Sequence, residues 1–202
     1  MESKKHNIIL DLDQTLISAE PCEEIDMRKY KNKSKLFRSD NMDGYYIVYS
    51  RPFLQEFLTF LFNNFNVTIW TAASKDYALF IIENIILNKD NSRELDFIFF
   101  SYHCKLSKHH KKYSKELSML WDIHNLPEYS SKNTVILDDF KSDVHKCQPN
   151  NCIIAPPFEF TEKGSENDTF LKDLIPQLEA LKNRMNMEDE NLAVIINQEN
   201  KT

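Results

Sequence analysis

Short apolar runs recur along this chain of 202 residues, and most are followed by a segment with helical periodicity. The first, residues 8–10, is wholly apolar and lacks the alternation with polar residues that marks a half-exposed strand. Such a run is typical of a strand buried on both faces, as in a parallel sheet. The pattern predicts further strands at residues 67–71, 97–100, 134–137 and 152–155.

Between these strands, apolar residues recur at three- and four-residue spacing and predict helices that bury one face. The pair Arg51-Pro52 opens the first helix, because proline is tolerated in a helix's first turn. Its apolar stripe, which we interpret as core packing, comprises Phe53, Leu54, Phe57, Leu58, Leu61 and Phe62. The other helices are expected at 74–85 with Ser74 as N-cap, at 115–121, and at 168–181 with Asp168 as cap and a kink at Pro176.

Strands that alternate with helices predict an α/β fold, with a central parallel sheet flanked by helices and right-handed crossovers. Residues 17–44 are polar and charged, and a strand-like run follows at 45–49. We expect this insert, about residues 17–49, to form a small β-flap after the first strand. One domain is expected over residues 1–185, and a loosely held acidic tail over 186–202 in which 192–196 could dock.

Composition narrows the possible partners. The net charge of −6 makes nucleic acid an unlikely partner, since nonspecific binding to phosphate backbones needs clustered positive charge. Only two glycines are present, which argues against glycine-rich phosphate loops. The four cysteines form no C-x-x-C pair, and no stretch approaches the ~18 apolar residues of a membrane span. We expect a protein of the nucleus or cytoplasm without a membrane partner, and abundant Asn, Lys and Ile suggest an A+T-rich genome, for example that of a large DNA virus.

Two of the predicted strands end in paired carboxylates. Asp11 and Asp13 follow the first strand, and Asp138 and Asp139 follow the run at 134–137. The carboxyl ends of parallel strands border the crevice where open α/β sheets bind ligands. Crowded carboxylates repel each other unless a cation or a shared proton relieves them. The pattern therefore predicts a divalent metal site whose oxygen ligands suit Mg²⁺, although either pair taken alone could belong to an ordinary turn.

Five short motifs, in this order, resemble those of the haloacid dehalogenase superfamily. They are most similar to the FCP/SCP-type (NIF-like) phosphatases that act on the RNA polymerase II C-terminal domain, and the resemblance covers roughly residues 7–181. The motifs are DLDQTL at 11–16, RPFLQEFL at 51–58, TAASKDYA at 71–78, YSKELS at 113–118 and LDD at 137–139. The resemblance implies a haloacid dehalogenase-like, Rossmannoid fold and a Mg²⁺-dependent phosphomonoester hydrolase, first of all a protein serine/threonine phosphatase.

The resemblance also implies a catalytic role for each matching residue. Asp11 would be the nucleophile that forms an aspartyl-phosphate. Asp13 would protonate the leaving hydroxyl and then take a proton from the hydrolytic water. Lys115 would offset charge on the phosphoryl oxygens, and Thr71 would donate a hydrogen bond to them. Thr15 would support the loop and orient Asp13.

The implied metal site draws on both aspartate pairs. Mg²⁺ would be held by the Asp11 carboxylate, the backbone carbonyl of Asp13 and the Asp139 carboxylate. Asp138 would act through a bound water and position Lys115.

In two places the sequence departs from the family pattern. The family often carries a phosphate-side arginine before the motif lysine, and none is present here. The basic run 105–115 could supply that charge and recruit acidic or phosphorylated substrates through Lys105, Lys108, Lys111 or Lys112. An apolar pocket for a substrate proline could be lined by Ile47, Val48 and Tyr49, but Ser74 is polar where small members tend to be apolar.

Other functions stay open on the same fold. A nucleic-acid or small-molecule phosphatase would use the same groups, although a chain with a flap and no large cap favours macromolecular substrates. A non-catalytic scaffold is the remaining alternative, and against it all the expected catalytic groups are present. The expected partner is a phosphorylated protein, with the RNA polymerase II C-terminal domain as one candidate.

Overall fold

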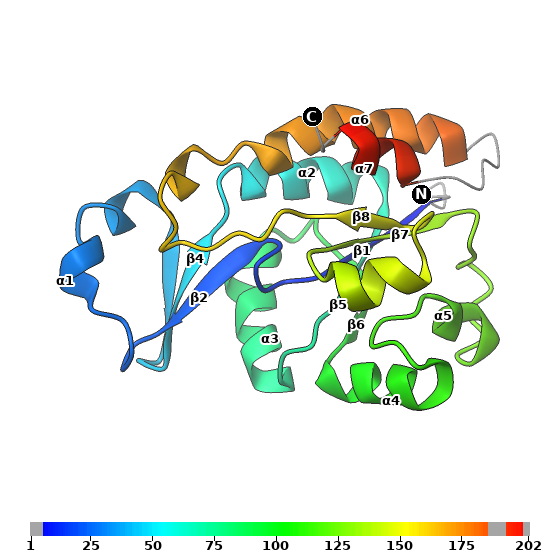
Figure 1. The fold of residues 1–202 in the computed structure, drawn as a ribbon, viewed down its shortest axis with the longest axis horizontal. Coiled ribbons are helices and arrows are strands. Elements are labelled where there is room, and N and C mark those ends of the chain that lie inside the picture. Colours follow the sequence, from blue (N-terminus) through cyan, green and yellow to red (C-terminus); the bar gives the residue numbers. More distant parts are fainter. Residues whose placement is uncertain (1–5, 186–192, 200–202) are drawn as a thin grey trace.

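A five-stranded parallel sheet forms the centre of the computed structural model, which describes residues 6–185 and 193–199 (Figure 1). Its strands follow the order β6-β5-β1-β7-β8, and every neighbouring pair is parallel. The strands are β1 (Asn7–Leu10), β5 (Asn66–Trp70), β6 (Leu95–Phe99), β7 (Thr134–Asp138) and β8 (Cys152–Ile154). The predicted α/β fold is confirmed.

Helices cover both faces of this sheet (Figure 1). Successive side chains of a strand point to opposite faces, so Ile8 and Leu10 join one core while Ile9 joins the other. The first core is closed by α2 (Leu54–Asn64), α3 (Lys75–Ile81), its continuation η2 (Ile82–Ile86) and α6 (Phe170–Met185), and the second by α4 (Ser101–Lys111) and α5 (Ser118–Asp122). Within the described ranges, no helix is both long and apolar enough to cross a membrane.

The predicted β-flap lies beside the sheet as a separate antiparallel unit (Figure 1). Its strands, in the order β2-β4-β3, are β2 (Ile17–Pro21), β3 (Ser39–Met42) and β4 (Tyr46–Ser50), with the short helices α1 (Met27–Tyr30) and η1 (Ser34–Leu36) between β2 and β3. Of these three strands, the sequence predicted only β4. Tyr49 anchors the flap by stacking on Phe160 at a centroid distance of 3.6 Å.

Two predicted helix boundaries were wrong, and one helix was missed. The first helix begins at Leu54 rather than at Arg51-Pro52, and Phe53 before it has a left-handed φ of 62° and is 39% exposed. The basic run, which was given no element, lies largely in α4. The helix expected from Lys115 begins only at Ser118, because the chain first turns to carry Lys115 into the interior.

Arg51 instead ties three segments together from a position that is 1% exposed. Its Nε and Nη2 donate to the two oxygens of Asp168 at 3.0 and 2.8 Å. Its Nη1 donates to the carbonyl oxygens of Thr15 and Pro156 at 2.9 and 3.0 Å. Asp168 also accepts from the backbone N–H of Phe170, which confirms it as the cap of α6. The loop after β1 is therefore joined to the start of the last long helix, which continues through Pro176.

Residues 193–199 pack on the edge strand β8 rather than hanging loosely, with α7 spanning Val194–Glu199. The Asn197 amide pairs with the strand backbone: its Oδ1 accepts from Ile154 N at 2.8 Å, and its Nδ2 donates to Cys152 O at 2.7 Å. Ala193 and Ile196 are buried in the first core. Of the expected docking segment, Leu192 lies outside the described residues. Two further short helices, η3 (Lys141–His145) and η4 (Ser165–Asn167), complete the fold.

Candidate active site

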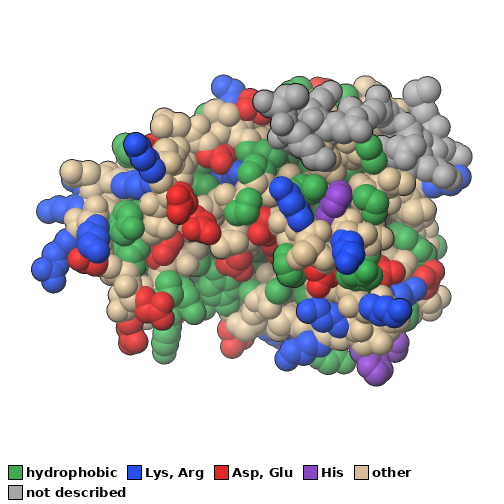
Figure 2. Space-filling view, viewed as in Figure 1, with side chains coloured by type: hydrophobic (Ala, Val, Ile, Leu, Met, Phe, Trp, Pro, Cys, Tyr) green, Lys and Arg blue, Asp and Glu red, His purple; other side chains and the backbone are tan. Residues whose placement is uncertain are grey.

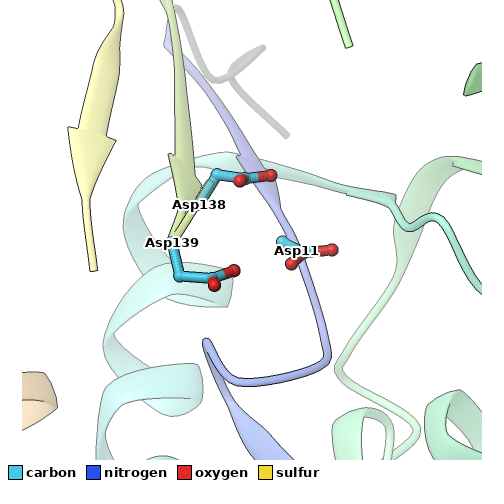
Figure 3. Close-up of side chains that lie close together, drawn as sticks. All are labelled: Asp11, Asp138 and Asp139. Atoms are coloured by element: carbon cyan, nitrogen blue, oxygen red, sulfur yellow. The ribbon is translucent and has the colours of Figure 1, made fainter. Parts of the chain in front are cut away.

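Three carboxylates meet where β1 and β7 end (Figure 3). The two strands are adjacent and in register, with Leu10 beside Leu137, so the next residues, Asp11 and Asp138, lie side by side. Asp139 follows, and one carboxylate oxygen from each aspartate lies within 4.8 Å of the others. The structure therefore brings Asp11 of the first aspartate pair together with both aspartates of the second pair.

A buried amine is inserted into this carboxylate cluster. Lys115 Nζ lies 2.6 Å from Asp11 Oδ1 and 2.7 Å from Asp138 Oδ2, and the lysine is only 4% exposed. Its loop is fixed from both sides, because Ser114 N donates to Asp143 Oδ1 and Gln148 Nε2 donates to the Lys115 carbonyl. Lys115 is thus held as an ion-pair partner of the cluster rather than as a surface lysine.

The cluster carries more negative charge than Lys115 can balance. Burial raises the pKa of Asp11 to about 7; Lys115 opposes this shift, and the neighbouring Asp138 adds to it. Burial and Asp138 likewise raise the pKa of Asp139. For Lys115 burial lowers the pKa, but Asp11 and Asp138 outweigh it and keep the amine charged. The cluster thus holds three carboxylates and one ammonium group, and its possible metal ligands are all oxygen atoms. Such a site fits a hard divalent cation such as Mg²⁺.

Asp13 points to a different partner. Its Oδ1 accepts a hydrogen bond from the Tyr77 hydroxyl at 2.5 Å, and burial raises the pKa of its carboxyl above the ordinary value. Tyr46 packs edge-on against the Tyr77 ring at 5.5 Å. A raised pKa suits a carboxylic acid that must give up a proton near neutral pH. The sequence analysis gave Tyr77 no role in the site, because a tyrosine in the first turns of an amphipathic helix is usually interpreted as a core residue.

The two predicted threonines are both buried. Thr15 Oγ1 lies 3.4 Å from Asp139 Oδ1 as a donor, so it orients a carboxylate of the cluster rather than Asp13. Thr71 Oγ1 accepts from Ala73 N at 3.1 Å, which fixes the turn after β5. This contact uses an oxygen lone pair and leaves the Thr71 O–H free to act as a donor. Its role toward a phosphate stays a prediction.

A cavity of about 360 Å³ opens beside Asp13, between the flap and the start of α3. The predicted lining was wrong: Ile47, Val48 and Tyr49 do not line this cavity, and Val48 and Tyr49 are buried within the flap. Ser74, at the N-cap of α3, does line the cavity, and its side chain makes no capping hydrogen bond. The full lining is Asp13, Ala19, Tyr46, Ala73, Ser74 and Tyr77.

The lysines suggested as substitutes for a phosphate-side arginine lie on α4 and at its C-terminal end. Lys111 pairs with Asp122 at 2.5 Å, and Lys108 with Asp143 at 3.8 Å. Lys105 and Lys112 are exposed. Their contribution to substrate binding stays a prediction.

Comparison with known proteins places this site in a family. The model of the NLI interacting factor-like phosphatase family matches residues 6–189. A CTD phosphatase-like protein of Invertebrate iridescent virus 6 is 49% identical over 172 residues, covering 83% of this chain and 94% of that protein. Its counterpart in Invertebrate iridescent virus 3 is 40% identical over 186 residues, covering 89% and 98%. Both relatives are viral, which agrees with the expectation of a viral source.

Solved structures show the same fold. The fission yeast RNA polymerase II CTD phosphatase Fcp1 bound to beryllium fluoride matches 90% of this chain with a TM-score of 0.54 and 20% identity. The match covers 53% of the yeast chain, so this chain spans about half of its length.

Proposed function

The chain belongs to the NLI interacting factor-like phosphatase family and is a phosphatase of the FCP type, and we propose that it hydrolyses phosphoserine or phosphothreonine in proteins through a phosphorylated Asp11. The observation that carries this proposal is the placement of Asp11. It sits at the end of a buried strand, 2.6 Å from a lysine and within reach of two further carboxylates.

The reaction proceeds in two displacements on this geometry. An Asp11 oxygen forms a bond to phosphorus while the bond to the substrate oxygen breaks, and the Asp13 carboxyl gives its proton to that leaving oxygen. Asp13, now a carboxylate, takes a proton from a water whose oxygen attacks phosphorus. The phosphorus–Asp11 bond breaks and phosphate leaves, which restores both acids.

The other residues stabilise charge and hold the reacting groups. Lys115 offsets negative charge on the phosphoryl oxygens, and the Thr71 hydroxyl donates to one of them. Asp138 holds Lys115 in place from the far side. Asp11, Asp139 and the Asp13 carbonyl would hold a Mg²⁺ ion, which would supply further charge neutralisation at the phosphoryl oxygens.

A protein substrate is favoured by the form of the site. The cavity beside Asp13 continues along the flap and is not closed by a large cap domain. Such an opening accepts a loop or extended segment of a macromolecule. Phosphoproteins are also in keeping with the names of the relatives, which are CTD phosphatase-like proteins.

The catalytic proposal is tested with p-nitrophenyl phosphate. Purified protein should hydrolyse it with Mg²⁺, and EDTA should abolish turnover. Asp11→Asn should lower kcat by about a thousandfold or more, as removal of a nucleophile does. The matched control is Asp173→Asn, an exposed aspartate on α6, which should keep full activity. Retained activity in Asp11→Asn would exclude Asp11 as the nucleophile.

The substrate proposal needs a separate comparison. A phosphoserine peptide, a 3′-phosphorylated oligonucleotide and a small sugar phosphate should be offered to the same protein. We expect the highest kcat/KM for the phosphopeptide. A preference for the oligonucleotide or the sugar phosphate would keep the catalytic mechanism and replace the protein substrate with one of the alternatives.

A further inference from the structure

A second cavity extends the active site along the flap. It has a volume of about 320 Å³ and shares Asp13 and Ala19 with the cavity already described. A third, of about 350 Å³, shares Glu20 and Thr161 with the second and reaches α1. Because neighbouring cavities share lining residues, they form one groove that starts at Asp13 and crosses the flap. We call the second and third cavities together the flap groove.

The chemistry of the flap groove differs from that of the cavity beside Tyr77. Ala19, Tyr46 and Tyr77 give that cavity an aromatic and apolar lining. Besides Asp13, four carboxylates line the flap groove, and Figure 2 shows Asp and Glu side chains beside Lys and Arg side chains on the flap side of the molecule. Its carboxylates are Glu20 and Glu159 nearest Asp13, then Glu24 and Asp26, and Lys29 is its one basic lining residue in the described part of the chain.

Of these carboxylates, only Asp26 has a basic partner among the described residues, Arg28 at 3.8 Å. Glu20 accepts from Ser18 Oγ at 2.9 Å, and Glu159 from Gln14 Nε2 at 3.3 Å; both donors are neutral. Glu20, Glu24 and Glu159 form no salt bridge with any other described residue. The hydrogen bonds orient the carboxylates but leave their negative charge to face the groove.

The unpaired carboxylates of the flap groove lie near the entrance of the active site, where their charge affects which substrates bind. The substrate of the proposed reaction carries a phosphate, and added carboxylates near the entrance repel it. That repulsion is offset when the same substrate brings positive charge to the groove. A polypeptide can do so, because the residues that flank its phosphorylated side chain must continue away from Asp13 along an open path.

On the basis of the proposed phosphoprotein function, we propose that the flap groove binds Lys or Arg side chains in the substrate segment that flanks the phosphorylated residue on one side. Substrate selection then depends on charge as well as on the phosphate. The substrate segment on the other side of the phosphorylated residue lies toward the aromatic cavity, where a charged side chain is not required.

Paired phosphopeptides test this inference. Peptides share one phosphoserine and carry two lysines, two alanines or two glutamates on either the N-terminal or the C-terminal flank. We expect one lysine-flanked peptide to have a kcat/KM about tenfold above its alanine counterpart, as a few partly exposed ion pairs allow. The difference should lie in KM and shrink at high salt. Equal kcat/KM for lysine and alanine peptides on both flanks would overturn the proposal.

The variant Glu20→Gln/Glu159→Gln keeps both hydrogen-bond acceptors and removes both charges. It should bring the lysine preference to about twofold or less, while its kcat/KM for p-nitrophenyl phosphate should not fall, because the removed charges repel that phosphate. Glu179→Gln, an exposed glutamate on α6, is the matched control and should keep the wild-type preference. A lysine preference that survives in the double variant would exclude these two carboxylates.

A binding measurement separates this inference from the proposed function. Asp11→Asn protein, which cannot form the phosphorylated aspartate, should bind fluorescent lysine-flanked peptide about tenfold more tightly than alanine-flanked peptide in an anisotropy titration. If no phosphopeptide is turned over but this difference is found, the protein-phosphatase proposal fails and the groove proposal stands. If turnover is normal and the difference is missing, only the groove proposal fails.

Discussion

Lys115 and Asp11 are both almost completely buried, and neither could keep its charge at that depth without the other. Transfer of an isolated charge into a protein interior costs several kcal/mol, which a close partner of opposite sign offsets. Asp138 adds a second contact to the amine, and Thr15 donates to Asp139. The charge state of each group therefore depends on its neighbours, and a bound cation will change it.

The raised pKa of Asp11 makes magnesium stabilisation depend on pH. Folding raises this pKa from 3.8 to about 7, so the folded state binds more protons than the unfolded one between these values. Without metal, this group lowers stability as pH rises through that range. Magnesium competes with the proton, so thermal unfolding should show a larger Mg²⁺-induced rise in Tm at about pH 8 than at about pH 5.5. An equal rise at both values would contradict the assigned site.

Tyr77→Phe tests whether the hydroxyl positions the Asp13 carboxyl. The change keeps the ring and removes the hydrogen bond of 2.5 Å. We expect kcat/KM for a phosphoserine peptide to fall about tenfold, because its alkoxide leaving group needs a well-placed proton donor. 2,4-Dinitrophenyl phosphate, whose leaving group needs no proton, should be nearly unaffected. An equal loss on both substrates would point to a general structural effect, and Tyr45→Phe, with an exposed ring, is the control.

At the scale of elements, the catalytic loops lie where strands of one buried sheet end. β1 and β7 place Asp11 and Asp138, β5 places Thr71, and the turn between α4 and α5 delivers Lys115. Hydrogen bonds at the sheet edges hold this arrangement. The edge strand β8 is covered by the C-terminal segment. The Asn197 side chain of this segment makes two hydrogen bonds to the strand backbone that a further strand would otherwise make.

Asn197→Ala should therefore destabilise the fold. The substitution leaves the N–H of Ile154 and the carbonyl of Cys152 without their partner in an enclosed position. Loss of a partner for buried polar groups costs about 1–3 kcal/mol each. Thermal unfolding should show a Tm lower by roughly 4–24 °C, given about 2–4 °C per kcal/mol for a chain of this size. Asn32→Ala, in an exposed turn, should leave Tm unchanged, and a similar change in both variants would argue against the edge contact.

At the scale of the whole molecule, α4 and the flap groove are two surfaces that differ in charge. The chain has a net charge of −6, yet α4 and its C-terminal end carry four lysines and no acidic residue. The flap groove carries the carboxylates Glu20 and Glu159. Such a distribution orients a charged polypeptide as it approaches, because the summed field acts over distances longer than a single contact.

Neutralising the α4 lysines tests whether their positive charge contributes to substrate binding. Lys105, Lys108, Lys111 and Lys112 changed together to Gln should raise KM for a phosphopeptide with an acidic flank about three- to tenfold. The kcat for p-nitrophenyl phosphate should stay constant, and added salt should reduce the effect. An unchanged KM for the acidic peptide would show that this helix takes no part in recruitment.

The sequence by itself determined the parallel sheet and the acids at its strand ends. A strand buried on both faces must be apolar throughout, so residues 8–10 and 134–137 could be recognised locally. The flap strands β2 and β3 were not recognisable in this way, because they mix polar with apolar residues and most of these are only partly buried or exposed. The basic run was ambiguous for the same reason: α4 buries only Cys104 and Ser107.

Only the tertiary structure decided which side chains complete the site. The contact between Tyr77 and Asp13 joins residues 64 positions apart, and that between Lys115 and Asp11 joins residues 104 apart. Such contacts depend on the path of whole crossovers and on how the flap rests beside the sheet, which no local periodicity specifies. The flap groove was likewise decided by the tertiary structure, since Glu20 and Glu159 come from distant segments of the chain and line the same cavity only when the chain has folded.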